Sequence, residues 1–462
     1  MTVPRVAGVI DIGKTNAKFA LVDLKTRSEI AVRKAPNTVL MEGPYPHFDV
    51  ERLWDFLSGA IVELNREHQV DALSVTTHGA SAALLDADGD LALPVLDYEY
   101  AGPDVFAAEY DAARPSFAEC FSPRLPMGLN LGAQLFWQSR AFPGAFADTH
   151  SIVTYPQYWS HRLSGVLASE ITSLGCHTDL WNFQTDLYSS LVVRQGWLKK
   201  MPGVRLASDV LGPVKPELTA RLGLNRPVPV ICGIHDSNAS LLPHLLARRP
   251  PFAVVSTGTW VIVCAPGAEL SELDPARDCL ANIDAFGRPV ASARFMGGRE
   301  FSQLVGDEPV TPSEATVESV LREAILLLPS VVEGSGPFPH RKAHWSVPRE
   351  TLDRETVFAV TSFYLAMMTA ECLKLSGAAG ETVVEGPFAS NRLFTEMLAA
   401  ATDRPVVAMQ ASATGTSIGA ALLTDIAHAK ATETAVSAQA PSDRAPAMAH
   451  YADLWRAAVS GR

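Results

Sequence analysis

Two stretches of the chain, at 5–35 and 252–264, share an arrangement that limits how it can fold. Each has a short apolar run, a turn that combines Gly with Thr, and a second apolar run, and they start about 245 residues apart. In the first stretch a third strand follows another polar turn, which favours an antiparallel meander over a strand–helix unit. Two such starts indicate two similar α/β domains. The expected strands are 6–10, 17–23, 29–32, 72–76, 252–256 and 260–264, and a helix is expected at 50–68.

The length fits this division, because 462 residues suffice for two or three domains of roughly 100–200 residues. We expect an N-terminal domain at 1–235, a C-terminal domain at 236–428 and a tail at 429–462 that ends in a helix near 451–459. Hydrophobic residues make up 47% of the chain. That share excludes a disordered chain over most of its length.

Charge and apolar patterning restrict the partners. The 38 Lys and Arg against 50 Asp and Glu give a net charge of −12, which disfavours nucleic acid and anionic membranes. The most apolar segment, 355–371, is shorter than the ~20 residues of a membrane span, so we expect a buried helix there. Charged side chains interrupt the apolar run near the N-terminus, and the six cysteines are scattered. We therefore expect a soluble cytoplasmic protein.

The first turn lies in a sequence that matches a phosphate-binding loop. Residues 8–15 fit G-x-x-x-x-G-K-[ST], but their four intervening residues favour a strand, and another strand is expected after Thr15. We therefore expect no helix there, only a glycine turn that a phosphate could approach closely. Taken alone, these residues fit a plain hairpin turn better. The residues that would face a phosphate are Asp11, Gly13, Thr15, Asn16 and Lys18.

A second polar group follows the expected strand at 228–231, where the chain runs into His235 and Asp236. An acidic residue between a strand and a helix can cap the helix, which contributes about 1 kcal/mol. It can also act as a general base that faces a cleft, and His235 would add a second polar group. Taken alone, this stretch favours the cap.

The order of these segments is more specific than any one of them. The turn at 11–18, Asp236, the turn at 256–259 and a small-residue segment at 413–420 together resemble the FGGY family of carbohydrate kinases over roughly residues 5–425. The resemblance implies an α/β fold of two actin/hexokinase-type (ribonuclease H-like) domains with a cleft between them. It implies ATP and Mg²⁺ as cofactors, a sugar substrate bound by the N-terminal domain and a nucleotide bound by the C-terminal domain.

The resemblance also assigns roles to residues. Asp11 would lie near magnesium, and Asp236 would be the catalytic base that accepts a proton from the attacking sugar hydroxyl. Substrate-binding residues would be Thr77, His78, Gly79, His177, His235 and Asp236. Cofactor-binding residues would be Asp11, Gly13, Thr15, Asn16, Lys18, Thr257, Gly258, Thr259, Gly386, Asn391 and Gly415.

Three motifs resemble the L-rhamnulose and L-fuculose kinase branch: 235–240, 256–260 and 293–298. Three segments depart from the family pattern. Glu-Gly-Pro-Phe at 385–388 replaces a triple glycine, Tyr-Glu-Tyr at 98–100 lacks an arginine, and residues 172–182 differ from the corresponding segment of rhamnulose kinases. We therefore expect an ATP-dependent kinase of a small ketose, with a deoxy-ketose favoured. The alternatives are a pentulose or polyol kinase, a catalytically weak sugar or nucleotide sensor, and a nucleotide-operated scaffold on this fold. A homodimer is the expected assembly.

Overall fold

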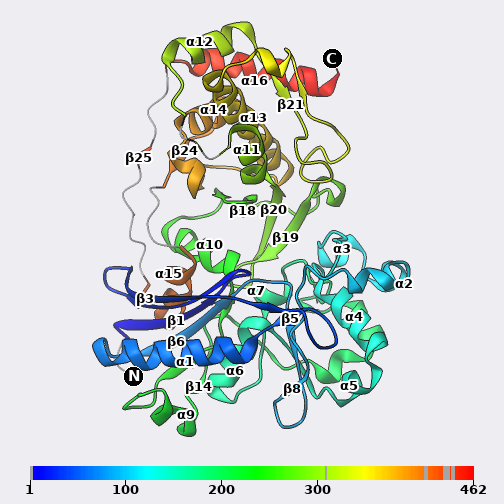
Figure 1. The fold of residues 1–462 in the computed structure, drawn as a ribbon, viewed down its shortest axis with the longest axis vertical. Helices are drawn as coiled ribbons and strands as arrows, with labels where there is room; N and C mark the ends of the chain where they lie inside the picture. The colour runs from blue at the N-terminus through cyan, green and yellow to red at the C-terminus, as the bar shows by residue number, and fades with distance from the viewer. Residues whose placement is uncertain are drawn as a thin grey trace. The chain divides into compact units, whose positions relative to one another are not determined.

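The computed structural model describes residues 4–306, 308, 310–409, 415–429, 437–438 and 443–461. The chain forms two compact units. Unit 1 comprises Met1–Ala247, Ala281–Pro289 and Ala413–Ala431, and unit 2 comprises Arg248–Leu280, Val290–Ser412 and Thr432–Arg462. Each unit contains a seven-stranded sheet with helices, so the expected α/β architecture is confirmed. Figure 1 shows the elements of each unit along the colour-coded chain.

The sheet of unit 1 starts with the expected meander. β1 (Val6–Ile12), β2 (Asn16–Asp23) and β3 (Ser28–Pro36) pair antiparallel, and β6 (Ala72–Thr77) runs parallel to β1. The full order is β14-β15-β6-β1-β2-β3, with β16 also paired to β6. The other strands of this sheet are β14 (Val210–Pro213), β15 (Pro229–Ile231) and β16 (Ile234–His235).

Alternate side chains of β1 supply two cores. Ile10 and Ile12 lie in one hydrophobic cluster with Trp54 of α1 (Val50–Glu67) and Trp159 of α6 (Tyr155–Ser164). Ala7 and Val9 lie in another, with α10 (Asp236–Ala247) and α15 (Gly415–Leu422). Since successive strand residues face opposite sides, the near-continuous apolar run of β1 matches a sheet covered on both faces. Figure 1 shows α1 and α6 on one face and α10 and α15 on the other.

The rest of unit 1 contains further strands and helices, and part of it forms a third hydrophobic cluster that includes Tyr110, Trp137 and Trp181. Its strands are β4 (Val39–Leu40), β5 (His47–Phe48), β7 (Ala82–Leu85), β8 (Leu91–Leu93), β9 (Ser151–Thr154), β10 (Ser169–Glu170), β11 (Trp181–Asn182), β12 (Leu187–Tyr188) and β13 (Val204–Arg205). Its helices are α2 (Ala107–Ala113), α3 (Phe117–Cys120), α4 (Leu131–Ala141), α5 (Pro143–Asp148), α7 (Ile171–Leu174), α8 (Ser190–Arg194) and α9 (Pro216–Arg221).

Unit 2 repeats the strand–turn–strand start, with β17 (Ala253–Thr257) antiparallel to β18 (Val261–Pro266) and parallel to β23 (Thr382–Glu385). Its sheet order is β19-β20-β18-β17-β23-β24-β25. The remaining strands are β19 (Cys279–Ile283), β20 (Pro289–Phe295), β21 (Leu327–Leu328), β22 (His344–Trp345), β24 (Val406–Ala408) and β25 (Ser437–Ala438). The helices are α11 (Gly297–Val305), α12 (Glu314–Glu323), α13 (Arg354–Leu375), α14 (Arg392–Thr402) and α16 (Ala445–Ser460).

Helix α13 is the buried helix expected at 355–371. Within the part of the chain that the structure describes, it is the one helix long and apolar enough to cross a membrane, and 83% of its most apolar stretch is buried in the protein. The terminal helix is present as α16, where Tyr451 Oη donates to Ile325 O at 2.7 Å and Trp455 Nε1 donates to Leu327 O at 2.8 Å. This end of the expected tail is thus part of the core of unit 2.

The compact units divide differently from the expected domains. The division falls after Ala247 rather than after residue 235, and α15 returns to unit 1 rather than belonging to the second domain. The reason is close helix packing: a Cβ at Gly419 of α15 would overlap the carbonyl oxygen of Ala239 in α10. Ser240 Oγ and Thr416 Oγ1 also lie 2.8 Å apart across these two helices.

Candidate active site

The turn between β1 and β2 is a hairpin turn. Gly13 N donates to Asn16 O at 2.8 Å, and Asn37 Nδ2 donates to Gly13 O at 2.8 Å. Thr15 and Asn16 are exposed, and β2 follows directly. The absence of a helix after this turn confirms that the segment is no P-loop, while its exposed hydroxyl and amide leave donors for a ligand.

Beside this turn lies a buried charge cluster. Lys18 Nζ is 3.3 Å from Asp11 Oδ2 and 3.2 Å from Glu29 Oε1. Ser417 Oγ of α15 donates to Asp11 Oδ2 at 3.1 Å. Burial raises the pKa of Asp11 although Lys18 opposes the shift. Lys18 therefore forms ion pairs with two carboxylates of its own unit, which sequence reasoning did not foresee.

Asp236 is the first residue of α10, directly after β16. The parallel pairing of β16 with β6 places His235 opposite Thr77, which brings the loop at 77–79 beside Asp236. Asp236 Oδ1 accepts from Ser237 N at 2.6 Å and lies 3.2 Å from His235 Nε2, and 32% of its side chain is exposed. Burial raises the pKa of Asp236. The carboxylate can thus both receive a helix N–H and take up a proton.

The loop at 77–79 holds a neutral histidine. The rings of Phe48, Tyr98 and Tyr155 lie 5.0–5.3 Å from the ring of His78, and burial lowers the pKa of His78 to about 4. His78 Nδ1 lies 2.8 Å from Gly79 O, which fixes the proton on Nδ1. Nε2 is left as an acceptor, and it has no hydrogen-bond partner among the described residues.

The other expected sugar contacts have structural partners. Thr77 Oγ1 donates to His78 O at 2.9 Å, and a Cβ at Gly79 would lie 2.9 Å from His235 Nε2. His177 Nδ1 lies 2.8 Å from Leu129 O, and the preceding residue, Cys176, has its Sγ 3.8 Å from His235 Nε2. The structure therefore places Thr77 and Gly79 beside His235 within unit 1, whereas His177 contacts the main chain at Leu129.

Within unit 2, the turn after β17 is tied to the segment 385–388. Thr257 Oγ1 donates to Glu385 O at 2.6 Å and accepts from Phe388 N at 3.0 Å. Gly386 has φ 82°, and a Cβ there would overlap the carbonyl oxygen of Thr257. A single glycine, Gly386, is therefore sufficient at the point where this segment passes closest to the turn. The hydroxyl of Thr257 holds the main chain of the segment on either side of that glycine.

The exposed residues of this turn, Gly258 and Thr259, line a cavity of about 780 Å³ within unit 2. Its aromatic wall has Phe301 5.8 Å from Phe358 and 5.6 Å from Phe388 between ring centroids. The other lining residues are Gly298, Arg299, Ser302, Pro387, Ser390 and Asn391. The volume and the aromatic wall suit a flat heterocycle.

Sequence reasoning found part of this cavity. Asn391, expected there, caps α14 by accepting from Phe394 N at 3.2 Å and donates to Ser362 Oγ at 2.9 Å. Gly415, grouped with it, lies in unit 1 at the start of α15, and residues 413–414 lie outside the described residues. Phe301 and Phe358 were missed, because apolar residues of a helix carry no signal that separates a cavity wall from a core.

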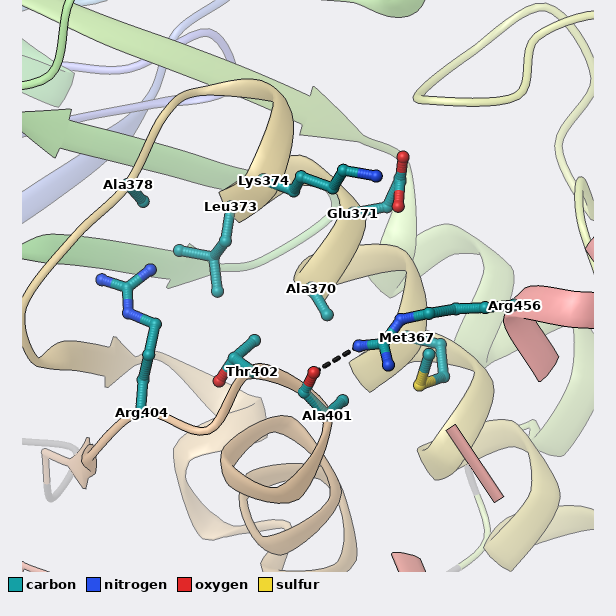
Figure 2. Close-up of a pocket in the computed structure, with 10 residues that line it drawn as sticks. All are labelled: Met367, Ala370, Glu371, Leu373, Lys374, Ala378, Ala401, Thr402, Arg404 and Arg456. Carbon is teal, nitrogen blue, oxygen red and sulfur yellow. Dashed lines mark hydrogen bonds between the residues drawn. The ribbon is translucent and has the colours of Figure 1, made fainter. Parts of the chain in front are cut away.

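A second cavity in unit 2, of about 240 Å³, holds three cationic side chains (Figure 2). Arg456 donates to Ala401 O, and Arg404 donates to Ala379 O and Gly380 O at 2.8 Å. The side chain of Lys374, which also lines the cavity, extends toward Glu371 in Figure 2. The arginines donate to main-chain carbonyls near the ends of α13 and α14. We therefore assign them a structural role in unit 2 rather than a role in ligand binding.

Unit 1 offers a magnesium ion one carboxylate, that of Asp11. Among the residues that the structure describes, no three His, Cys, Asp or Glu side chains are grouped as metal ligands. Mg²⁺ usually takes one or two carboxylates and completes its shell with water and phosphate oxygens. Asp11 supplies one such carboxylate beside the exposed turn, where Lys18 and Ser417 hold it in place.

Known proteins resemble this chain in sequence and in fold. Residues 123–243 match the family model of the FGGY family of carbohydrate kinases, N-terminal domain, and residues 249–434 match carbohydrate kinase FGGY, C-terminal domain. A carbohydrate kinase from Novosphingobium aromaticivorans has a TM-score of 0.91 at 34% identity, with 99% of each chain covered. A xylulose kinase from Rhodospirillum rubrum has a TM-score of 0.80 at 18% identity, with 99% of this chain and 98% of that chain covered, and shares the fold. The L-fuculokinase of Escherichia coli K12 is 24% identical over 272 residues, and the match spans 57% of each chain, a little over half the relative's length.

Proposed function

Because the chain belongs to the FGGY family of carbohydrate kinases, whose members transfer phosphate to an alcohol group, we propose that it phosphorylates a hydroxyl of a small ketose with ATP. The observation that carries this proposal is the Asp236 carboxylate, partly exposed at the start of α10 and beside the neutral side chain of His78. The likeness to an L-fuculokinase favours a deoxy-ketose, and a pentulose or polyol is the second candidate.

Phosphoryl transfer depends on positioning and on charge stabilisation more than on covalent chemistry. Asp236 accepts the proton of the sugar hydroxyl as that oxygen attacks the γ-phosphate. Asp11 would hold magnesium, which would neutralise phosphate charge. The exposed Thr15 and Asn16 offer hydrogen-bond donors to phosphate oxygens, while Lys18 stays with its two carboxylates and fixes Asp11.

We place the nucleotide in the 780 Å³ cavity of unit 2, with the adenine against the aromatic wall formed by Phe301, Phe358 and Phe388. The exposed Gly258 and Thr259 would then face the phosphates. The side chains of Thr257 and Asn391 shape this cavity by holding the main chain and the start of α14. We also propose a cytoplasmic location and a homodimer.

We expect His78→Phe to raise the KM for the sugar about tenfold and to leave the KM for ATP unchanged. The phenyl ring keeps the packing against Phe48 and Tyr155 but removes the Nε2 acceptor that a sugar hydroxyl would meet. Steady-state kinetics with each substrate varied in turn measures both constants. An unchanged KM for the sugar would remove His78 from the binding site.

The pH profile should report the raised pKa of Asp236. The base works only when deprotonated, so kcat/KM for the sugar should be constant at high pH. It should fall as pH drops through a pKa above the ordinary value of 3.8, because burial disfavours the charged carboxylate. The measurement uses saturating Mg-ATP. An acid limb at or below 3.8 would contradict the assignment.

The substrate class can be tested by ADP release from Mg-ATP with a panel of acceptors. The panel contains L-fuculose, L-rhamnulose, both xyluloses, both ribuloses, erythrulose, erythritol and glycerol. The aldose isomers of these ketoses serve as negative controls. One strongly preferred ketose would support the proposal and name the substrate. Tight ATP binding without sugar-stimulated turnover would favour a sensor or a scaffold instead.

A further inference from the structure

The chain segment before Asp236 is held from one side by α6. Ser160 Oγ donates to Ile231 O at 3.1 Å and to Cys232 O at 3.0 Å, and Gln157 Nε2 donates to Cys232 O at 3.1 Å. These contacts engage the carbonyls of the segment. The N–H of His235, directly before Asp236, is engaged by a different element.

That N–H donates to Thr172 Oγ1 at 3.1 Å. The Thr172 hydroxyl in turn donates to Glu170 Oε2 at 2.7 Å, and the same carboxylate accepts from Thr172 N at 2.8 Å. Glu170 and Thr172 are fully buried. The hydroxyl of Thr172 donates its one hydrogen to Glu170. Its oxygen can therefore only accept at its other positions, and the hydrogen bond to Glu170 orients it toward His235 N.

The ring of His235 is also engaged inside unit 1. Asn238 Nδ2 lies 3.2 Å from His235 Nδ1, and an amide nitrogen can only donate, so Nδ1 accepts and the neutral ring carries its proton on Nε2. Nε2 lies 3.8 Å from Cys176 Sγ and 3.2 Å from Asp236 Oδ1. His235 is only 5% exposed. Both ring nitrogens therefore face protein atoms, which leaves His235 no polar atom for a sugar.

We propose that Thr172, held by Glu170, is a positioning residue that sets the Asp236 carboxylate through the main-chain N–H of His235. The inference rests on the proposed function, since it assigns Asp236 as the base. The inference also changes the role assigned to His235, from an expected sugar contact to a member of the network that positions Asp236. A general base displaced by about 1 Å loses about 100-fold in rate, so a single buried hydroxyl in this place can control kcat.

The test compares Thr172→Val, which has the same shape without the hydroxyl, with Thr172→Ser, which keeps it. We expect Thr172→Val to lower kcat by about 10- to 100-fold with the KM for ATP unchanged, and Thr172→Ser to retain most of the rate. The matched control is Thr149→Val, which removes another buried hydroxyl, one that donates to Ala145 O at 3.2 Å. This control should lower the Tm without lowering kcat per folded molecule.

Amide hydrogen exchange of the peptide around 231–238 gives a second readout that needs no substrate. Thr172→Val should lose the protection of His235 N–H, and Thr172→Ser and Thr149→Val should keep it. Equal kcat in the two Thr172 variants, or unchanged exchange in Thr172→Val, would overturn the inference. If the wild-type protein phosphorylates no acceptor, the proposed function fails, and the exchange comparison still decides whether Thr172 holds His235.

Discussion

Asp236→Asn is expected to lower kcat for sugar phosphorylation by about 10²- to 10⁴-fold, the range that a positioned general base contributes. The amide keeps the size of the side chain and its oxygen can still accept from Ser237 N, but it cannot take a proton at neutral pH. The change removes a negative charge close to Asp11, so the fold should be retained. Turnover under saturating Mg-ATP and sugar measures the effect.

Two measurements separate this result from a loss of folding. The Tm of Asp236→Asn should lie at or above that of the wild type. The affinity for ATP should be unchanged, because the cavity proposed for the nucleotide is in unit 2. A variant with these properties that still turned over at the wild-type rate would show that Asp236 is a helix cap alone.

The second large effect is expected from Gly298→Ala. Gly298 lines the cavity that we propose for the nucleotide, and a Cβ there would overlap the carbonyl oxygen of Gly258 in the turn after β17. Because the obstructing atom belongs to the main chain, the turn or α11 must move, at about 1–3 kcal/mol. We expect the Kd for Mg-ATP to rise about 10- to 100-fold, measured by isothermal titration calorimetry.

The control for this substitution is Gly59→Ala in α1. A Cβ at Gly59 meets nothing within 4 Å, and alanine is preferred in a helix, so this variant should bind ATP normally and gain up to about 1 kcal/mol in stability. If Gly298→Ala also bound ATP normally, the assignment of the nucleotide to this cavity would be wrong.

The strand starts and the position of Asp236 could be predicted from sequence because each depends on local patterns. The apolar run of β1, the Gly turn and the strand after it are encoded within about twenty residues, and they also excluded the P-loop. Asp236 stands out as an acidic residue between a short strand and a helix. The order of such segments along the chain was sufficient to suggest the family.

Features that depend on packing between distant segments could not be predicted. Lys18 could have faced a phosphate, and only the placement of Glu29 on β3 shows that it binds two carboxylates. Thr172 lies 63 residues before the N–H that it accepts from, and no periodicity links them. The return of α15 to unit 1 depends on its packing against α10 and β1, including the close approach at Gly419, which a single sequence does not reveal.

The central claim is that the chain moves the γ-phosphate of ATP to a sugar hydroxyl rather than to water. The most direct measurement is the amount of sugar phosphate, determined by mass spectrometry, against the ADP released in the same reaction with the preferred ketose. We predict one sugar phosphate for each ADP, with both products lost together in Asp236→Asn. ADP release accompanied only by inorganic phosphate, or equal product formation in Asp236→Asn, would contradict the account.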